Sequence, residues 1–205
     1  MRFGRKVGLL VAGLALGLMA SATFAASSSP SLPTQFGKTL PPIGFVKFCI
    51  ENPTECVATG STDKPMAISP EQWNLVFQVN TFVNGKIAPV SDMELYGQAE
   101  YWTYPTTAGD CEDYLLLKKR YLEGLGFPSS ALLITVVLDE KKEGHAVLTL
   151  ATDGGDFILD NRRNEVLDWE KANYTFLKRQ SSANPRQWVA LAKQKSETPE
   201  RLASQ

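Results

Sequence analysis

One hairpin constrains the fold of this chain more than any other feature of its sequence. Two β-rich runs, residues 145–151 and 156–160, are separated by the turn-forming residues Asp153-Gly154-Gly155. Turn residues of this kind between two β-rich runs predict a pair of adjacent antiparallel strands. A third β-rich run, 131–138, comes just before them. We therefore expect an antiparallel sheet in the C-terminal half of the chain.

The length of the hairpin loop decides which side chains share a face of that sheet. If Asp153 and Gly154 are the two loop residues, Asp160 lies opposite Val147 and diagonally across from His145, with Cα atoms about 7–8 Å apart. A carboxylate and an imidazole at that separation can form a hydrogen bond. A three-residue loop would instead put Asp160 on the opposite face, because side chains alternate along a strand.

Two helices are predicted before the strands. Ser69-Pro70-Glu71-Gln72 combines a capping serine, a proline suited to the first turn and the glutamine of a capping box, and apolar residues follow at helical spacing toward Gly85. The second helix is expected from Cys111 to Gly124, with one apolar side and a glycine stop. Helices followed by an antiparallel sheet predict an α+β fold. We expect one domain over residues 38–193, because no repeat or second linker interrupts that range.

Both ends of the chain are predicted to lie outside this domain. Residues 1–26 have a basic start, an apolar run over 7–19 and small residues near the end, which is the layout of a secretory signal peptide. The alternative is a membrane anchor, but the apolar run is shorter than the roughly 20 residues that a membrane span requires. Residues 27–37 form a polar, proline-rich lead-in and 194–205 a polar tail, both expected to be disordered. The mature protein should have no transmembrane segment.

Charge argues against nucleic acid as a partner. The whole chain has 21 Lys and Arg against 22 Asp and Glu, and residues 1–26 hold three of the basic and none of the acidic side chains, which leaves a net charge of -4. No basic block remains in the mature chain, so nucleic acids and anionic membrane surfaces are poor candidates.

The three cysteines divide into a pair and a single thiol. Cys49 and Cys56 are separated by six residues that include the turn-forming Asn52-Pro53. In an exported protein such a pair predicts a structural disulfide. A redox switch or a metal pair is the alternative, although the spacing is wrong for a zinc knuckle and no histidine is near. Cys111 is then the free thiol, and His145 is the one histidine available to it.

Cys111 has the features of a nucleophile and one feature against it. A helix start offers free N–H groups and a positive dipole end, which lower the pKa of a thiol. Asp110, Glu112 and Asp113 surround it with negative charge, which raises that pKa. Either an imidazolium at His145 or a bound cation must offset them. Asp110 and Glu112 offer the hard oxygen ligands that calcium takes, but acidic residues at a helix start can also simply compensate the dipole.

The chain resembles the bacterial transglutaminase-like cysteine peptidases, and in particular their LapG-like periplasmic branch. The resemblance covers roughly residues 38–192. The segments that carry it are Tyr101-Trp102, Gly109-Asp110-Cys111-Glu112-Asp113-Tyr114, Gly144-His145-Ala146-Val147 and Leu159-Asp160-Asn161.

This resemblance implies a papain/transglutaminase-like fold, with the nucleophile at a helix start packed on an antiparallel sheet. It implies a triad of Cys111 as nucleophile, His145 as general base and Asp160 as the residue that orients the imidazole. It also implies calcium carried by Asp110 and Glu112, no organic cofactor and a periplasmic location. Protein substrates such as surface adhesins, and an inner-membrane regulatory receptor of the LapD type, are the partners expected by the same resemblance.

Such a peptidase stabilises a tetrahedral oxyanion with hydrogen-bond donors. The backbone N–H of Cys111 is one candidate, and the side chain of Asn80 or Trp102 is a second. A buried amide such as Asn80 more often bonds to backbone groups. Two other functions use the same fold: acyl transfer to an amine, as in transglutaminases, and binding without catalysis. The intact Cys, His and Asp set favours an enzyme.

Overall fold

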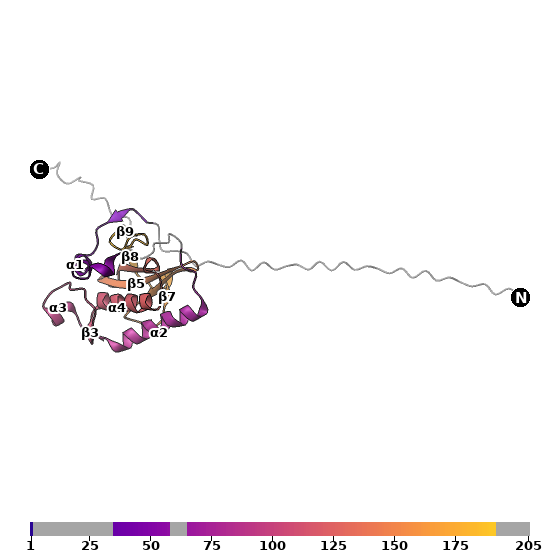
Figure 1. Ribbon diagram of the computed structural model, residues 1–205, viewed down its shortest axis with the longest axis horizontal. Helices are drawn as coiled ribbons and strands as arrows, with labels where there is room; N and C mark the ends of the chain where they lie inside the picture. The colour runs from indigo at the N-terminus through magenta and orange to yellow at the C-terminus, as the bar shows by residue number, and fades with distance from the viewer. Residues whose placement is uncertain (2–34, 58–64, 192–205) are drawn as a thin grey trace, which may run out of the picture.

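The computed structural model describes residues 35–57 and 65–191, together with Met1 (Figure 1). Apart from Met1, the predicted signal peptide lies outside the described residues, as do most of the predicted lead-in and the whole predicted tail. Within the described part of the chain, no helix has both the length and the apolar character needed to cross a bilayer.

A seven-stranded antiparallel sheet forms one layer of the molecule, with the strand order β1-β9-β8-β4-β5-β6-β7. The three predicted strands are its central members β4, β5 and β6. The strands are β1 (Lys38–Thr39), β4 (Leu132–Leu138), β5 (Gly144–Thr152), β6 (Gly155–Leu159), β7 (Leu167–Asp168), β8 (Thr175–Gln180) and β9 (Trp188–Ala190).

The helices precede the main part of the sheet in the chain and pack on it, so the predicted α+β architecture is confirmed. Helix α4 packs against β5 and has α2 along its other side (Figure 1). A short parallel pair of strands, β2 and β3, joins the segment after α2 to the segment before α4. The elements are α1 (Ile43–Glu51), η1 (Pro53–Cys56), α2 (Pro70–Lys86), β2 (Ala88–Pro89), α3 (Asp92–Tyr96), β3 (Ala108–Gly109), α4 (Cys111–Gly124), η2 (Ser129–Ala131) and η3 (Trp169–Lys171).

Both predicted helices begin where the sequence predicts. The Ser69 side chain accepts from the Gln72 N–H at 3.2 Å, and the Gln72 side chain accepts from the Ser69 N–H at 2.9 Å, so the capping box is confirmed. A cap of this kind contributes about 1 kcal/mol to helix stability. Helix α4 begins at Cys111, as the sequence predicts.

Apolar side chains fill both faces of the sheet. The larger core lies between helices and sheet, where Leu115 and Leu122 of α4 meet Leu148 and Leu150 of β5, and all four are at most 1% exposed. Burying each such side chain contributes about 1.5–3 kcal/mol. A smaller cluster covers the opposite face, with Val137, Val147 and Phe176 among its members. Because the sheet is covered on both faces, the central strands are apolar almost throughout.

The Cys49–Cys56 disulfide is confirmed. It joins α1 to η1 across seven positions, with Cα atoms 5.7 Å apart. Closing a loop of that length stabilises a fold by about 2 kcal/mol. The bond also leaves Cys111 as the free thiol.

Candidate active site and metal centre

The hairpin has the two-residue loop on which the sequence argument depends. Thr152 pairs with Gly155, so the two residues between them form the loop. Extending this register by one residue beyond the end of β6 puts Asp160 opposite Val147, on the face that His145 shares. The predicted register is confirmed.

His145 and Asp160 meet through their side chains in a buried setting. Their atoms Nε2 and Oδ1 are 3.0 Å apart, and the two residues are 4% and 1% exposed. Burial alone would raise the pKa of Asp160, but the hydrogen bonds from His145 and Tyr174 outweigh it and lower that pKa to about 2. The carboxylate is therefore ionised at neutral pH and can only accept. Nε2 must then carry the proton, which leaves Nδ1 as the ring nitrogen that can take another.

The thiol of Cys111 hydrogen bonds to its acidic neighbour. Sγ lies 2.9 Å from Oε2 of Glu112. Burial, followed by the charge of Glu112, raises the pKa of Cys111 well above its usual range, while a hydrogen bond from the backbone of Ala146 acts in the other direction. The acidic flanks thus oppose thiolate formation, as the sequence predicts.

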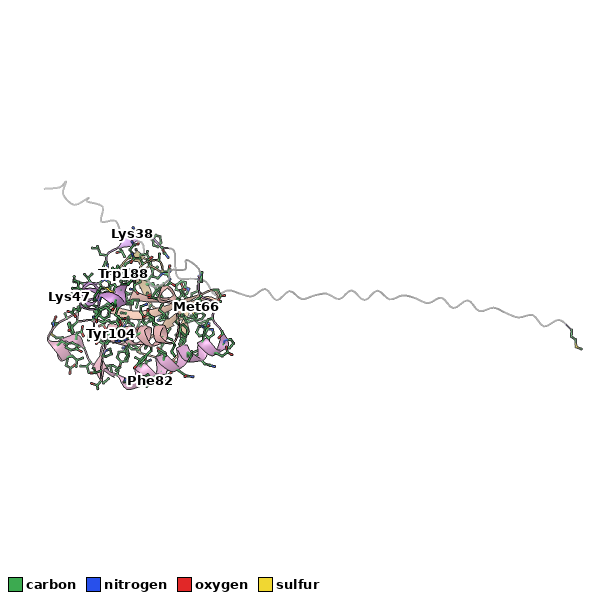
Figure 2. The ribbon with its side chains drawn as sticks, in the orientation of Figure 1. Lys38, Lys47, Met66, Phe82, Tyr104 and Trp188 are labelled. Carbon is green, nitrogen blue, oxygen red and sulfur yellow. A yellow bond between two sulfur atoms is a disulfide. The ribbon has the colours of Figure 1, made fainter. Side chains whose placement is uncertain are left out.

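Cys111 and His145 line one cavity of about 310 Å³. Trp102 forms part of its wall and donates from Nε1 to Oε2 of Glu100 at 3.0 Å. Gly44 of α1 packs so closely on this ring that a Cβ there would lie 2.3 Å from a ring carbon. A glycine is therefore required at position 44 for α1 to hold the Trp102 wall in place. A larger cavity of about 1170 Å³ lies elsewhere, between α2 and α4, beside Phe82 at the outer edge of the molecule (Figure 2).

Asn80, one of two predicted oxyanion donors, lies away from the residues that line this cavity. Its Nδ2 donates to the carbonyl oxygens of Arg163 and Asn164 at 3.2 and 3.0 Å. Asn80 therefore holds the loop that follows β6, which is the backbone-bonding alternative for a buried amide. Trp102 does line the cavity, with its indole N–H already donated to Glu100.

Three aspartates converge beside the thiol. One carboxylate oxygen from each of Asp92, Asp110 and Asp113 lies within 4.8 Å of the others. Each aspartate also accepts one backbone N–H: Asp92 from Tyr101, Asp110 from Asp92, and Asp113 from Thr103.

The remaining oxygen of each aspartate is buried without a hydrogen-bond partner: Oδ1 of Asp92, Oδ1 of Asp110 and Oδ2 of Asp113. Buried polar atoms are normally paired, so three orphaned carboxylate oxygens in one cluster fit a hard cation. Burial, followed by the neighbouring negative charges, raises the pKa of Asp113 to about 7. Gly109 makes room for this group, because a Cβ there would lie 2.5 Å from Oδ2 of Asp113.

The sequence predicts only part of this cluster. Asp110 belongs to it, whereas Glu112 is not among the three and directs its carboxylate to Cys111. Asp92 was missed because it lies 18 residues before Asp110. Ser91-Asp92 has the pattern of a helix start, but that pattern does not mark a metal ligand. Asp113 was named as a charged neighbour and not as a ligand.

Known proteins resemble this chain in sequence and in fold. Residues 35–196 match the family model for bacterial transglutaminase-like cysteine proteinases (BTLCP). No curated protein matches the chain. Calcium-bound LapG of Legionella pneumophila has a similar fold, with 23% identity and a TM-score of 0.51 over 64% of this chain and 76% of that one. EGTA-treated LapG from the same organism gives 24% identity and a TM-score of 0.50 over 63% and 72%.

Proposed function

Because the chain belongs to the bacterial transglutaminase-like cysteine proteinases, we propose that it is an exported endopeptidase that cuts peptide bonds with a triad of Cys111, His145 and Asp160. The observation that carries this proposal is the buried 3.0 Å contact of His145 with Asp160, next to a cavity that His145 lines together with a free thiol. A nucleophile, a base and a group that orients the base are the three parts that thiol catalysis needs.

Acylation uses the first half of this geometry. His145 takes the thiol proton of Cys111 at Nδ1, and the thiolate attacks the peptide carbonyl carbon. The tetrahedral oxyanion is stabilised by the backbone N–H of Cys111, which is free of intrahelical bonding at the start of α4. When the C–N bond breaks, His145 returns the proton to the departing amine and a thioester remains.

In the hydrolysis of the thioester, water is the nucleophile and the sulfur of Cys111 is the leaving group. His145 removes a proton from water as the hydroxyl attacks the thioester carbonyl, and the proton then passes to the sulfur as the acid product leaves. Asp160 keeps the imidazole in the required tautomer and stabilises its positive charge at both stages. The strongly lowered pKa of Asp160 supports this role, because the carboxylate stays ionised throughout.

Calcium fits the acidic cluster, with Asp92, Asp110 and Asp113 as the side chains that would hold it and Glu112 as a further predicted ligand. Their orphaned oxygens support this assignment. When bound, the ion would supply positive charge that offsets the carboxylates beside Cys111 and so lowers the pKa of the thiol.

Adding calcium to chelator-treated protein should raise its melting temperature by about 5–10 °C at a hundredfold excess over the dissociation constant. The physical reason is the relief of repulsion among buried carboxylates. Asp113→Asn should lose most of this shift. Asp153→Asn, in the exposed hairpin loop, is the matched control and should keep it. An Asp113→Asn protein that still responds like the wild type would place the ion elsewhere. Differential scanning calorimetry measures the melting temperatures of wild type, Asp113→Asn and Asp153→Asn. Glu112→Gln in the same series tests whether Glu112 is a fourth ligand.

We infer that residues 1–26 direct export, that residues 38–193 form the mature enzyme domain, and that it acts in the periplasm on surface proteins such as adhesins. An inner-membrane receptor of the LapD type is the regulatory partner in this proposal. The signal-peptide layout of residues 1–26 supports export, and the family match supports a protein substrate.

Product chemistry tests the proposed reaction. The mature chain is incubated with a surface-protein fraction, and new peptide termini are mapped by mass spectrometry with a primary amine present. We expect new N-termini and free carboxylates that depend on Cys111. If the new carboxyl ends carry the added amine as an amide, the enzyme is a transferase. If no termini depend on Cys111, the fold serves binding alone.

A further inference from the structure

Two side chains hydrogen bond to the Asp160 carboxylate, and the imidazole of His145 is one of them. We propose that Tyr174 is a positioning residue of the triad: its hydroxyl donates to the Asp160 oxygen that His145 does not use, and its ring borders the imidazole. This inference rests on the proposed peptidase function and adds a fourth member to its machinery.

The contacts of Tyr174 reach both partners of the charge pair. Its hydroxyl donates to Oδ2 of Asp160, while His145 and the backbone N–H of Arg162 share Oδ1. Its ring lies edge-on to the His145 ring, with centroids 5.6 Å apart. With one oxygen held by the hydroxyl, the carboxylate cannot rotate away from the imidazole without breaking a second hydrogen bond.

Two backbone irregularities aim Tyr174 at this site. The pairing of β8 with β4 shifts by one residue between Val136 and Val137, so Val137 pairs with Phe176. Tyr174, two residues earlier, therefore lies on the face of His145, which is the β5 partner of Val137. A continuous register would put Tyr174 on the helix-covered face. Bulges that redirect a side chain are common beside active sites.

The second irregularity is the residue just before the tyrosine. Asn173 has a positive φ of 57°, in the left-handed region that few non-glycine residues adopt. Asparagine tolerates it better than most. The constrained backbone at Asn173 therefore fixes the direction in which the chain enters β8, and with it the position of Tyr174.

The other charged groups around Asp160 do not replace this contact. Nε of Arg163 lies 3.6 Å from Oδ2, beyond hydrogen-bond length, and its side chain is 34% exposed to solvent. Arg162 directs its guanidinium to Asp139 at 2.9 Å. Lys118 of α4 is buried, and burial lowers its pKa to about 7, with the charge of Asp160 acting against that shift. The Tyr174 hydroxyl is the short, directed contact to Oδ2.

Tyr174→Phe removes the hydroxyl and keeps the ring. With p-nitrophenyl acetate as the acyl donor, we expect kcat to fall about tenfold, since a hydrogen bond to a charged group is lost. KM should stay unchanged, because Tyr174 is not among the residues that line the Cys111 cavity. The deficit in kcat should also grow as the pH falls. Without the donor, burial raises the Asp160 pKa, so the carboxylate protonates, and activity is lost, at a higher pH.

Tyr121→Phe is the matched control, since Tyr121 packs on Phe82 away from the triad, and it should leave kcat and its pH dependence unchanged. A Tyr174→Phe profile that coincides with this control would overturn the inference. So would an equal loss at every pH, because that is the mark of a purely structural defect. Wild-type turnover that persists in Cys111→Ala would instead remove the proposed function, so the two failures are distinguishable.

Discussion

Cys111→Ala is expected to abolish turnover, by about 10⁴-fold or more, because no other thiol is free to form the acyl-enzyme. The variant should fold normally, since it replaces one partly buried sulfur at a helix start and keeps the capping backbone. Release of p-nitrophenol from p-nitrophenyl acetate measures the loss, and circular dichroism checks the fold.

Alkylation tests the assignment of Cys111 independently of turnover. Iodoacetamide on the native, oxidised protein should label Cys111 alone, because Cys49 and Cys56 are bonded to each other. Labelling should be slow in chelator, since burial and the charge of Glu112 raise the pKa of the thiol, and faster with calcium. Label on Cys49 or Cys56, or turnover that survives in Cys111→Ala, would contradict the assignment of Cys111.

Asp160→Ala is expected to lower kcat by about 10⁴-fold, because the imidazole loses both its orientation and the charge that stabilises its protonated form. Asp160→Asn should fall between this variant and the wild type. Its carbonyl oxygen can still accept from Nε2 of His145, as asparagine does in Cys-His-Asn triads, but it has no charge. Steady-state kinetics of the three proteins checks this order, and an alanine variant as active as the wild type would exclude Asp160 from the triad.

Wild type and Asp160→Asn are also expected to respond differently to acid. The pKa of Asp160 is lowered to about 2 in the folded protein, against an ordinary value of 3.8. A lowered carboxyl pKa contributes stability above the ordinary value, and that contribution is lost as pH falls through the lowered one. The shift corresponds to about 2 kcal/mol. The unfolding free energies of wild type and Asp160→Asn, measured in urea, should therefore converge between pH 3.8 and about 2.

The parts of the fold that the sequence predicts are those with local signals. The capping box at Ser69, the end of α4 at Gly124 and the hairpin loop each depend on a few neighbouring residues, and each lies where the sequence predicts. The strands that flank β4, β5 and β6 in the sheet, namely β1, β7, β8 and β9, carry no such signal. They are short or interrupted by a register shift, and the pairing of β1, β8 and β9 is decided by partners far along the chain.

In the candidate site too, contacts between residues close in the sequence are predicted, and contacts from distant segments are not. The contact of His145 with Asp160 was predicted because both lie on one hairpin, where register alone sets their separation. Asp92 and Tyr174 reach the site from α3 and from the segment before β8, so nothing local marks them. Asn80 is an oxyanion candidate in the sequence because of its expected buried position on a helix. Position on a helix could not reveal that its amide is committed to two carbonyls in the loop after β6.

The one imidazole in the chain gives the protein a built-in spectroscopic reporter. His145 is the sole histidine in the sequence and lies at the centre of the proposed machinery. Its ring protons in an NMR spectrum therefore need no assignment by mutagenesis, and their chemical shifts report directly on the environment of the charge pair. Calcium, substrate analogues and the Tyr174 hydroxyl can each be followed through that one signal. The protein must be purified with a tag that has no histidine, because the ring-proton signals of a hexahistidine tag would overlap with that of His145.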